Sequence, residues 1–207
     1  MSSVDLNQTR NKVSIKVPLE VLPSRKTNQT PTPDDGDEKS HEEFCIALTD
    51  IPGHYNFRSE ITQKLKNAKA IVIILDSSDK SKYGEAAEIL YDVLSDIDII
   101  SERIPILVAC NKQDLTGRPH AIKLEKDLTT EIEQIRKVRM ATRKQVLDLA
   151  NRDANEEEDD ERQEIGYLET LKGKFAFNQL SNKVQFGDCC VKDGIIDEVL
   201  KFIACHV

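Results

Sequence analysis

Short apolar runs rich in β-branched residues alternate with longer segments of helical periodicity, and this alternation restricts the fold more than any other feature. The runs are FCIALT (44–49), AIVIIL (70–75), IPILVAC (104–110) and VQFGDC (184–189). Their continuous apolar character predicts strands that are covered on both faces. Strands alternating with helices predict βαβ units, and therefore an α/β fold with an open, mainly parallel sheet and helices on both faces.

The helical segments follow these runs at regular intervals. They are SEITQKLKN (59–67), YGEAAEILYDVLSDI (83–97), PHAIKLEKDLTTEIEQIRKV (119–138) and DGIIDEVLKFIA (193–204). Pro119 suits the first turn of its helix. Ahead of the first apolar run, VSIKVPLEV (13–21) alternates apolar and polar residues and contains Pro18, which predicts an edge strand interrupted by a bulge.

Two segments are too polar to pack into a core. Residues 23–43 contain three prolines and predict a flexible loop, and the acidic residues near 151–165 predict a disordered insertion. The domain organisation expected from this pattern has three parts. Residues 1–22 form an edge-strand segment, 23–43 a loop, and 44–207 the main domain.

Composition excludes several classes of function. A net charge of −8 makes a broad attraction to nucleic acid or acidic lipid improbable. The five cysteines are an odd number and predict buried thiols in a reducing compartment, and no Cys-x-x-Cys or His-Glu-x-x-His spacing argues for a metal cluster. No run approaches the roughly 20 apolar residues of a membrane span, so the chain alone is expected to be soluble.

The loop Asn111-Lys112-Gln113-Asp114 follows the third apolar run and has the pattern Asn-Lys-x-Asp. Ligands of open parallel sheets bind beyond the carboxyl ends of the strands. Asp114 can accept hydrogen bonds from N1 and the exocyclic amine of guanine, whereas adenine would present an acceptor to the same carboxylate. The stem of Lys112 can cover one face of the base, and Asn111 can tie the loop to its neighbours. This loop therefore predicts guanine recognition.

The loop Asp50-Ile51-Pro52-Gly53-His54 follows the first apolar run and has the pattern Asp-x-x-Gly. Asp50 can order a water on Mg²⁺, and the amide of Gly53 can reach a γ-phosphate because glycine has no Cβ. An amide bond that forms only with the third phosphate makes a switch. The alternative is a type II turn at Pro52-Gly53, and the Asn-Lys-x-Asp loop downstream favours the nucleotide interpretation.

A third loop, Cys190-Val191-Lys192, follows the last apolar run and can give a backbone amide to the guanine carbonyl oxygen. Asp-x-x-Gly, Asn-Lys-x-Asp and [Ser/Cys]-x-Lys in this order resemble the G3, G4 and G5 elements of Ras-like GTPases. More narrowly, DIPGHYNFR, ILVACNKQDLTGRPH and KFAFNQLSNKVQF resemble the family of signal recognition particle receptor beta subunits. The resemblance runs with gaps over about residues 44–205.

This resemblance implies a GTP-binding subunit on the cytosolic face of the endoplasmic reticulum membrane. Its GTP-bound form would hold the receptor's alpha subunit, and through it the ribosome and the signal recognition particle, without direct contact with nucleic acid. The implied cofactors are GTP and Mg²⁺.

The resemblance also implies a role for each motif residue. Gly53 would contact the γ-phosphate, Asp50 would reach Mg²⁺ through water, and the guanine contacts would come from Asn111, Lys112, Asp114, Cys190, Val191 and Lys192. His54 is the catalytic candidate because it could orient a water molecule, although a fast hydrolase is not expected. Tyr55 and Phe57 are expected to face a partner.

The sequence departs from the family ahead of Asp50. Family members carry a membrane span and then a Gly-x-x-x-x-Gly-Lys-[Ser/Thr] loop on their first strand, but the first glycine here is Gly36. The cradle for the β-phosphate is then missing, so GTP binding is expected to be weakened and hydrolysis weak or absent. Loss of the first strand would also remove a central strand and expose the edges of its neighbours.

Residues Asn11, Lys12, Val13 and Ser14 stand where the family's switch I segment leads into its second strand. In this alignment Val13 falls on the threonine that binds Mg²⁺ in the family. The alternative is an ordinary edge strand without ligand contacts.

Three functional interpretations remain open. The chain is a GTP-binding beta subunit seen in an incomplete version, a degenerate nucleotide-free module that holds the alpha subunit constitutively, or an Arf-like trafficking GTPase. Retention of the Asp-x-x-Gly and Asn-Lys-x-Asp motifs favours the first interpretation. The acidic insertion near 151–165 and the F-x-F-x-Q-L segment at 175–180 count against the third.

Overall fold

The structure is a computed structural model. It describes residues 11–18, 41–53, 58–65, 67–150 and 166–206. Several predictions therefore fall outside the described residues: those for His54, Tyr55 and Phe57, for most of the polar loop, and for the acidic insertion near 151–165.

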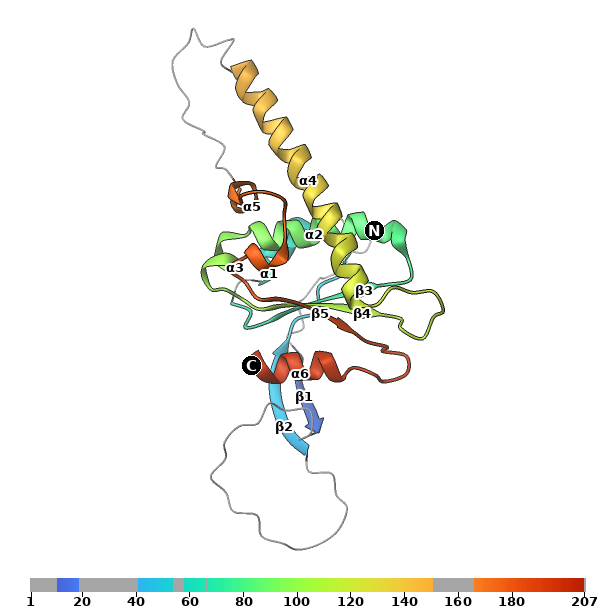
Figure 1. Cartoon of the computed structure of the whole chain (residues 1–207). Helices are drawn as coiled ribbons and strands as arrows, with labels where there is room; N and C mark the ends of the chain where they lie inside the picture. Colours follow the sequence, from blue (N-terminus) through green and yellow to red (C-terminus); the bar gives the residue numbers. More distant parts are fainter. Residues whose placement is uncertain (1–10, 19–40, 54–57, 66, 151–165, 207) are drawn as a thin grey trace, which may run out of the picture.

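A three-stranded parallel sheet forms the centre of the molecule (Figure 1). Its strands are β3 (Ile71–Asp76), β4 (Ile106–Asn111) and β5 (Val184–Asp188), in the order β3-β4-β5. The middle strand, β4, is apolar and buried up to its last residue, as expected of a parallel strand with helices on both sides. The predicted α/β class and parallel sheet are confirmed.

Helices cover both faces of this sheet. Helices α2 (Tyr83–Ser95) and α4 (Ala121–Ala150) lie on one face and α6 (Asp197–His206) on the other (Figure 1). Short helices α1 (Arg58–Leu65), α3 (Ile97–Ser101) and α5 (Tyr167–Thr170), with 3₁₀ turns at Lys80–Lys82 and Phe177–Gln179, complete the described elements. In α4 the residues Leu124, Leu128 and Ile132 recur every fourth position, so they form one buried stripe against α2 and the sheet.

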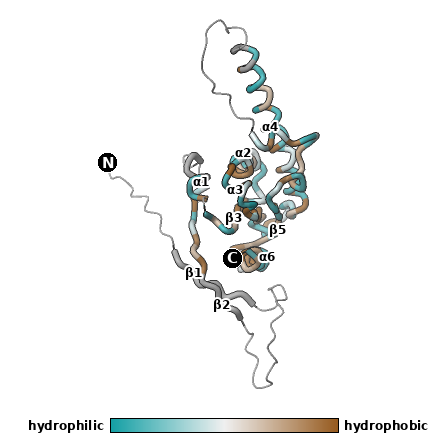
Figure 2. The backbone as a smooth tube through the Cα atoms, turned by 90° about the vertical axis from the view of Figure 1, so that its left-hand side faces the viewer, coloured by the Kyte–Doolittle hydropathy of each residue, from teal (hydrophilic) through white to brown (hydrophobic). Residues whose placement is uncertain are grey.

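Strands β1 (Asn11–Pro18) and β2 (His41–Leu48) form a separate antiparallel hairpin. Figure 2 shows this hairpin apart from the three-stranded sheet. Pairing is continuous from Asn11 and Leu48 to Pro18 and His41, so the predicted bulge at Pro18 is wrong. Proline is tolerated there because it ends the strand and the strand lies at an edge.

The prediction that residues 44–49 form a strand covered on both faces is also wrong. Ile46 is buried, but Ala47 and Thr49 are exposed, and Leu48 is 46% exposed. The physical reason is that β2 pairs only with β1, outside the layers of helix and sheet that bury β4. An apolar run alone does not reveal which strands end up inside those layers.

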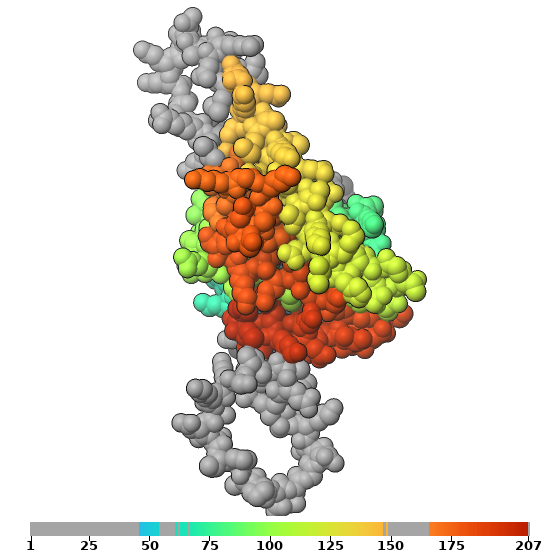
Figure 3. Space-filling view, in the orientation of Figure 1, coloured from blue at the N-terminus to red at the C-terminus, as the bar shows by residue number. Residues whose placement is uncertain are grey.

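Helix α4 is longer than its apolar periodicity predicts, because it continues past residue 138 to Ala150. Its additional residues rise above the body of the molecule (yellow to orange in Figure 3). Arg139 anchors the beginning of this extension, since its guanidinium bonds Asp92 at 2.8 Å and lies 4.2 Å from the ring centroid of Tyr91. Arg143 forms a second ion pair, with Glu169.

The F-x-F-x-Q-L segment belongs to the core. The rings of Phe175 and Phe177 are buried and meet edge to face, with centroids 5.1 Å apart. A few residues later, the buried amide of Asn182 donates to the carbonyl oxygens of Ile99 and Ile104 at 2.8 and 3.0 Å. These contacts hold the chain in place as it enters β5.

Cys110, Cys189 and Cys190 are free buried thiols, as predicted, whereas Cys205 is exposed, so the prediction is wrong there. Burial raises the pKa of Cys110 to about 12, which keeps this thiol protonated. Among the described residues, no helix combines the length and apolar character needed to cross a membrane.

Candidate functional site

The loops that follow β3, β4 and β5 meet at one end of the sheet. Asp76, the last residue of β3, is paired in register with Asn111, the last residue of β4. Cys110 is paired with Asp188 at the end of β5. Because the three strands are parallel, their carboxyl ends share one edge, which is where an open α/β sheet places its ligand.

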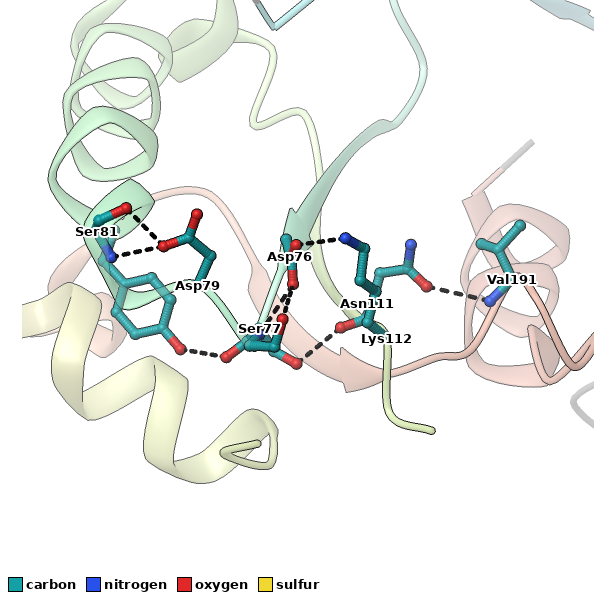
Figure 4. Close-up of polar contacts among 9 residues, drawn as sticks. Asp76, Ser77, Asp79, Ser81, Asn111, Lys112 and Val191 are labelled. Atoms are coloured by element: carbon teal, nitrogen blue, oxygen red, sulfur yellow. Dashed lines mark hydrogen bonds and ion pairs between the residues drawn. The ribbon is translucent and has the colours of Figure 1, made fainter. Parts of the chain in front are cut away.

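Asn111 ties the loop after β4 to the loop after β5. Its Oδ1 atom accepts a hydrogen bond from the backbone N–H of Val191 at 3.1 Å, and the Cys189 thiol lies 3.9 Å from the same oxygen. Figure 4 shows the Asn111 side chain pointing toward Val191. The sequence-based expectation that Asn111 ties its loop to a neighbour describes this contact.

Lys112 points in the opposite direction, toward the end of β3 (Figure 4). Its ammonium group bonds the carboxylate of Asp76 at 2.6 Å, and Ser78 donates to the other oxygen of that carboxylate. Lys112 lowers the pKa of Asp76, and Asp76 raises the pKa of Lys112. The backbone of Lys112 has a left-handed φ of 65°, a strained conformation for lysine that recurs at functional sites.

Asp114 carries the carboxylate predicted to read guanine. Its side chain is 17% exposed and bonds the ammonium group of Lys192 at 3.1 Å, while the Cys190 thiol donates to its second oxygen at 3.5 Å. Lys192 lowers the pKa of Asp114, so the carboxylate is ionised at neutral pH and can only accept hydrogen bonds. Asp114 is therefore an acceptor that already holds two donors.

Cys190 also contacts a second acid, because its Sγ atom lies 3.2 Å from Asp193, so its single S–H proton is shared between Asp114 and Asp193. The ligand atoms of Asp114, Cys190 and Asp193 lie within 4.8 Å of one another. Desolvation raises the pKa of Cys190, which favours the neutral thiol over the thiolate that a metal ion requires. This cluster is a hydrogen-bonded support for Asp114.

A tight turn after β5 presents Val191 and Lys192. Cys190 and Ile195 exchange two backbone hydrogen bonds, of 2.8 and 2.9 Å, across this turn. Gly194 has a φ of 73°, a conformation that glycine adopts without strain. The turn thereby fixes the N–H of Val191 toward Asn111.

Ser77 and Gln113 form hydrogen bonds beneath the exposed surface of the loops, and sequence reasoning missed both. Ser77 is fully buried, and its hydroxyl donates to the carbonyl oxygen of Asn111 at 2.7 Å (Figure 4). Gln113 donates to the hydroxyl of Ser77 and to the carbonyl oxygen of Pro119, and it accepts from Arg118. A buried serine directly after an apolar strand was the signal that could have revealed this network.

Asp188 is a second residue that sequence reasoning missed. Its carboxylate accepts from the backbone N–H of Ala121, the first residue of α4, at 2.8 Å, and it contacts His120 at 2.9 Å. A carboxylate at a helix N-terminus satisfies a free donor and interacts favourably with the helix dipole. Asp188 thus joins the end of β5 to the start of α4.

The Asp-x-x-Gly loop stands apart from these three loops. Asp50 and Gly53 are exposed, and within the described residues no hydrogen bond or ion pair links them to Asn111, Asp114 or Val191. The φ of Gly53 is not positive, so the type II turn considered for Pro52-Gly53 is not formed. An added Cβ at Gly53 would meet no atom within 4 Å, so the space beside its Cα atom is open.

The remaining predicted positions are described only in part or not at all. Asn11, Lys12, Val13 and Ser14 lie in β1, where the structure describes the backbone. His54, the catalytic candidate, is outside the described residues.

A partly open pocket lies between the loops after β4 and β5. Its lining includes Gln113, Asp114, Arg118, Asp188, Cys189, Cys190, Asp193 and Ile195. The ionised carboxylate of Asp114 is an acceptor for a ligand with two adjacent N–H donors, as guanine has. Ile195 and the thiols of Cys189 and Cys190 also line the pocket and suit the face and edge of a planar base. The lining residues therefore fit guanine.

Comparison with known proteins identifies similar sequences over most of the chain. A sequence model described as the signal recognition particle receptor beta subunit matches residues 12–184. The human signal recognition particle receptor subunit beta is 32% identical over 152 residues, which are 72% of this chain and 51% of that protein. The chain spans about half the length of the curated relatives it matches.

Two solved structures from Chaetomium thermophilum are similar in fold. The signal recognition particle receptor SRb-GDP-Mg has a TM-score of 0.57 at 22% identity, over 77% of this chain and 79% of that chain. The SRb-GTP/SRX complex has a TM-score of 0.57 at 19% identity, over 99% of this chain and 81% of that chain. At this level of identity the likeness concerns the fold, which is that of the Ras-like small GTPases.

Proposed function

Because the chain belongs to the family of signal recognition particle receptor beta subunits, we propose that it binds guanine nucleotide through the loops after β4 and β5. The base would be read by Asn111, Lys112, Asp114, Cys190 and Val191, and Lys192 would give up its place on Asp114 to the base. The match of the receptor beta subunit model to residues 12–184 also favours this family over the Arf-like trafficking GTPases.

The observation that carries the proposal is the state of Asp114. It is an ionised carboxylate that lines a pocket and is held there by Lys192 and Cys190. Guanine would replace the Lys192 ammonium group with N1–H and the exocyclic amine as donors. Lys192 is 78% exposed, so its release into water costs little.

The phosphates and Mg²⁺ would lie toward the Asp-x-x-Gly loop. Gly53 is exposed and has open space beside its Cα atom, which allows a phosphate oxygen to approach its backbone, and Asp50 is an exposed residue whose carboxylate could hold a water ligand of Mg²⁺. Mg²⁺ would neutralise phosphate charge when bound. We propose nucleotide binding as the activity that matters, with hydrolysis slow or absent.

The proposed partner is the receptor's alpha subunit, at the cytosolic face of the endoplasmic reticulum membrane. The family resemblance supports this assignment, and the fungal SRb-GTP/SRX complex is a precedent for a similar protein bound to GTP and a second component. Ribosome and signal recognition particle would be reached through the alpha subunit. The net charge of −8 argues against direct binding to nucleic acid.

One observation favours the second candidate, a nucleotide-free module that holds the alpha subunit constitutively. The polar groups of the base loops already have internal partners, Asp76 for Lys112 and Lys192 for Asp114. Such loops are stable without a ligand. The two candidates therefore differ in whether a nucleotide displaces these ion pairs.

Titration of the chain with fluorescent GTP in the presence of Mg²⁺ separates them. We expect a Kd below about 1 mM. Asp114→Asn should weaken GTP binding by about a hundredfold or more and favour a xanthine nucleotide, because the amide presents a donor to the guanine N–H groups. Asp193→Asn, a neutralisation in the same pocket, should retain the preference for guanine. Absence of binding by the parent chain would reject the guanine site.

A capture experiment tests the partner. Alpha-subunit N-terminal domain should be retained by this chain more strongly with GTP than without nucleotide. Asp114→Asn should abolish the GTP-dependent gain. Equal capture in all conditions would contradict a switch and support the constitutive module.

A further inference from the structure

The buried hydroxyl of Tyr83 links helix α2 to the loop after β3. Tyr83 is the first residue of α2 and is 4% exposed, and its hydroxyl donates to the backbone carbonyl oxygen of Ser77 at 2.6 Å. A phenol hydroxyl that is removed from water needs such an acceptor, because an unpaired buried donor costs free energy. Burial raises the pKa of Tyr83, which keeps the hydroxyl protonated and therefore able to donate.

A capped 3₁₀ turn directs the Tyr83 side chain back toward the end of the sheet. The carboxylate of Asp79 accepts from the backbone N–H and the hydroxyl of Ser81, at 3.0 and 2.6 Å (Figure 4). The N–H of Tyr83 donates to the carbonyl oxygen of Lys80, so α2 begins directly after this turn. Side-chain caps of this kind fix a turn locally. The hydroxyl of Tyr83 can therefore reach the carbonyl oxygen of Ser77, six residues earlier.

Ser77, which accepts this bond, is itself bonded to the loop after β4. Its backbone N–H and its hydroxyl both donate to the carbonyl oxygen of Asn111, at 3.2 and 2.7 Å. Gln113 donates to the same hydroxyl. The side-chain oxygen of Asn111 in turn accepts from the N–H of Val191 (Figure 4). Hydrogen bonds therefore run in series from Tyr83 on α2 to Val191 in the loop after β5.

We propose that Tyr83 is a positioning residue for guanine binding, whose hydroxyl holds the loop after β4, and through it the loop after β5, in the geometry that receives the base. The inference rests on the guanine site proposed above and adds to it a residue of α2 that acts through Ser77. The ring of Tyr83 packs in the core, and phenylalanine would fill nearly the same space. The role therefore belongs to the hydroxyl, which only tyrosine supplies.

A double-mutant cycle on GDP affinity tests the proposal in the full chain. Tyr83→Phe should weaken GDP binding about threefold, because one positioning hydrogen bond is lost. In an Asn111→Ala background, where the link to Val191 is already broken, the same change should weaken binding by less than about 1.5-fold. The matched control is Tyr91→Phe, at a buried tyrosine of α2 whose ring lies against Arg139, and it should leave the affinity unchanged. Equal losses in both backgrounds would overturn the proposal.

NMR spectra of the chain without nucleotide test the same link directly. Tyr83→Phe should move the amide proton of Val191 upfield, because its hydrogen bond to Asn111 lengthens, and should leave Ile106, at the start of β4, in place. A hydroxyl with a purely structural role would lower the urea midpoint without moving Val191 or the GDP affinity, and that result would overturn the proposal. If the parent chain binds no GDP, the guanine site fails, and the Val191 shift alone decides whether Tyr83 holds the loops.

Discussion

The two ends of the candidate nucleotide site differ in how they are held. The base end consists of loops after β3, β4 and β5, which are joined by hydrogen bonds such as Asn111 to Val191 and Ser77 to Asn111. The phosphate end consists of Asp50 and Gly53 after a two-stranded hairpin, and both residues are exposed. The base end is therefore organised before a ligand arrives, whereas in the Asp-x-x-Gly loop Ile51 packs against the core and, among the described residues, Asp50 and Gly53 have no hydrogen bond to the base loops.

This difference follows from the strand that each loop leaves. Strand β4 is buried and pairs with a strand on each side, so the position and direction of the loop that follows it are fixed. Strand β2 has a single neighbour and an exposed Leu48 at its end. We infer that base recognition depends on the core of the sheet, while phosphate recognition requires the ligand to position the Asp-x-x-Gly loop that follows β2.

The largest expected effect comes from the core beneath the base end. Leu128 is 1% exposed on α4, and Leu128→Ala should lower the free energy of unfolding by about 2–5 kcal/mol through lost burial and a cavity. Leu48→Ala in the hairpin, at a residue 46% exposed, should change it by less than about 0.5 kcal/mol. Urea unfolding measures both. Equal losses would remove the distinction between the two regions.

Ser77 links the core to the base loops, and its loss should be smaller. Ser77→Ala removes the donor to Asn111 and one acceptor for Gln113, at a cost of about 1–2 kcal/mol in unfolding free energy. The matched control is Ser78→Ala, because the Ser78 hydroxyl donates to Asp76 in an exposed hydrogen bond, and its loss should cost less unfolding free energy. If both variants unfold at the same urea concentration, the buried network does not stabilise the loops.

Asn111→Ala should release the loop after β5 without unfolding the chain. The N–H of Val191 loses its acceptor, and guanine nucleotide affinity should fall about fivefold, since one positioning hydrogen bond contributes about 1 kcal/mol. Nucleotide titration measures the change, with unfolding followed in parallel. Unchanged affinity would mean that the base loops are not organised by this bond.

The smallest effect concerns acid titration at the end of β3. Lys112 holds the pKa of Asp76 below its ordinary value. The ion pair therefore stabilises the folded chain fully when the pH is above the ordinary pKa of an aspartate, and this stabilisation is lost as the pH falls through the lowered pKa. Lys112→Met should raise the titration midpoint of the Asp76 carboxyl carbon in NMR. Lys82→Met, which removes an ion pair with Glu85, should leave that midpoint unchanged. A midpoint that does not respond to Lys112→Met would show that the ion pair is absent in solution.

Periodicity and apolar runs were sufficient to predict the parallel sheet, most helices and the position of the loops after β4 and β5 at one end of the sheet. They were sufficient because β4 and its neighbours follow local patterns that burial reinforces. The roles of Ser77, Gln113 and Asp188 were not predictable, since they arise from strand register and from contacts between residues far apart in sequence. The exposure of β2 was missed for the same reason, because an apolar run carries no information on its neighbours.

Backbone NMR spectra recorded during a titration with GDP, with ADP in a parallel titration, test most directly the claim that the base end is preformed. We predict that GDP shifts the amides of Lys112, Asp114 and Val191, while ADP leaves them unchanged because Asp114 rejects its acceptor pattern. The amides of Ile73 in β3 and Val108 in β4 lie within the sheet, away from the loops, and serve as unperturbed references. Equal shifts with both nucleotides, or with neither, would contradict the account.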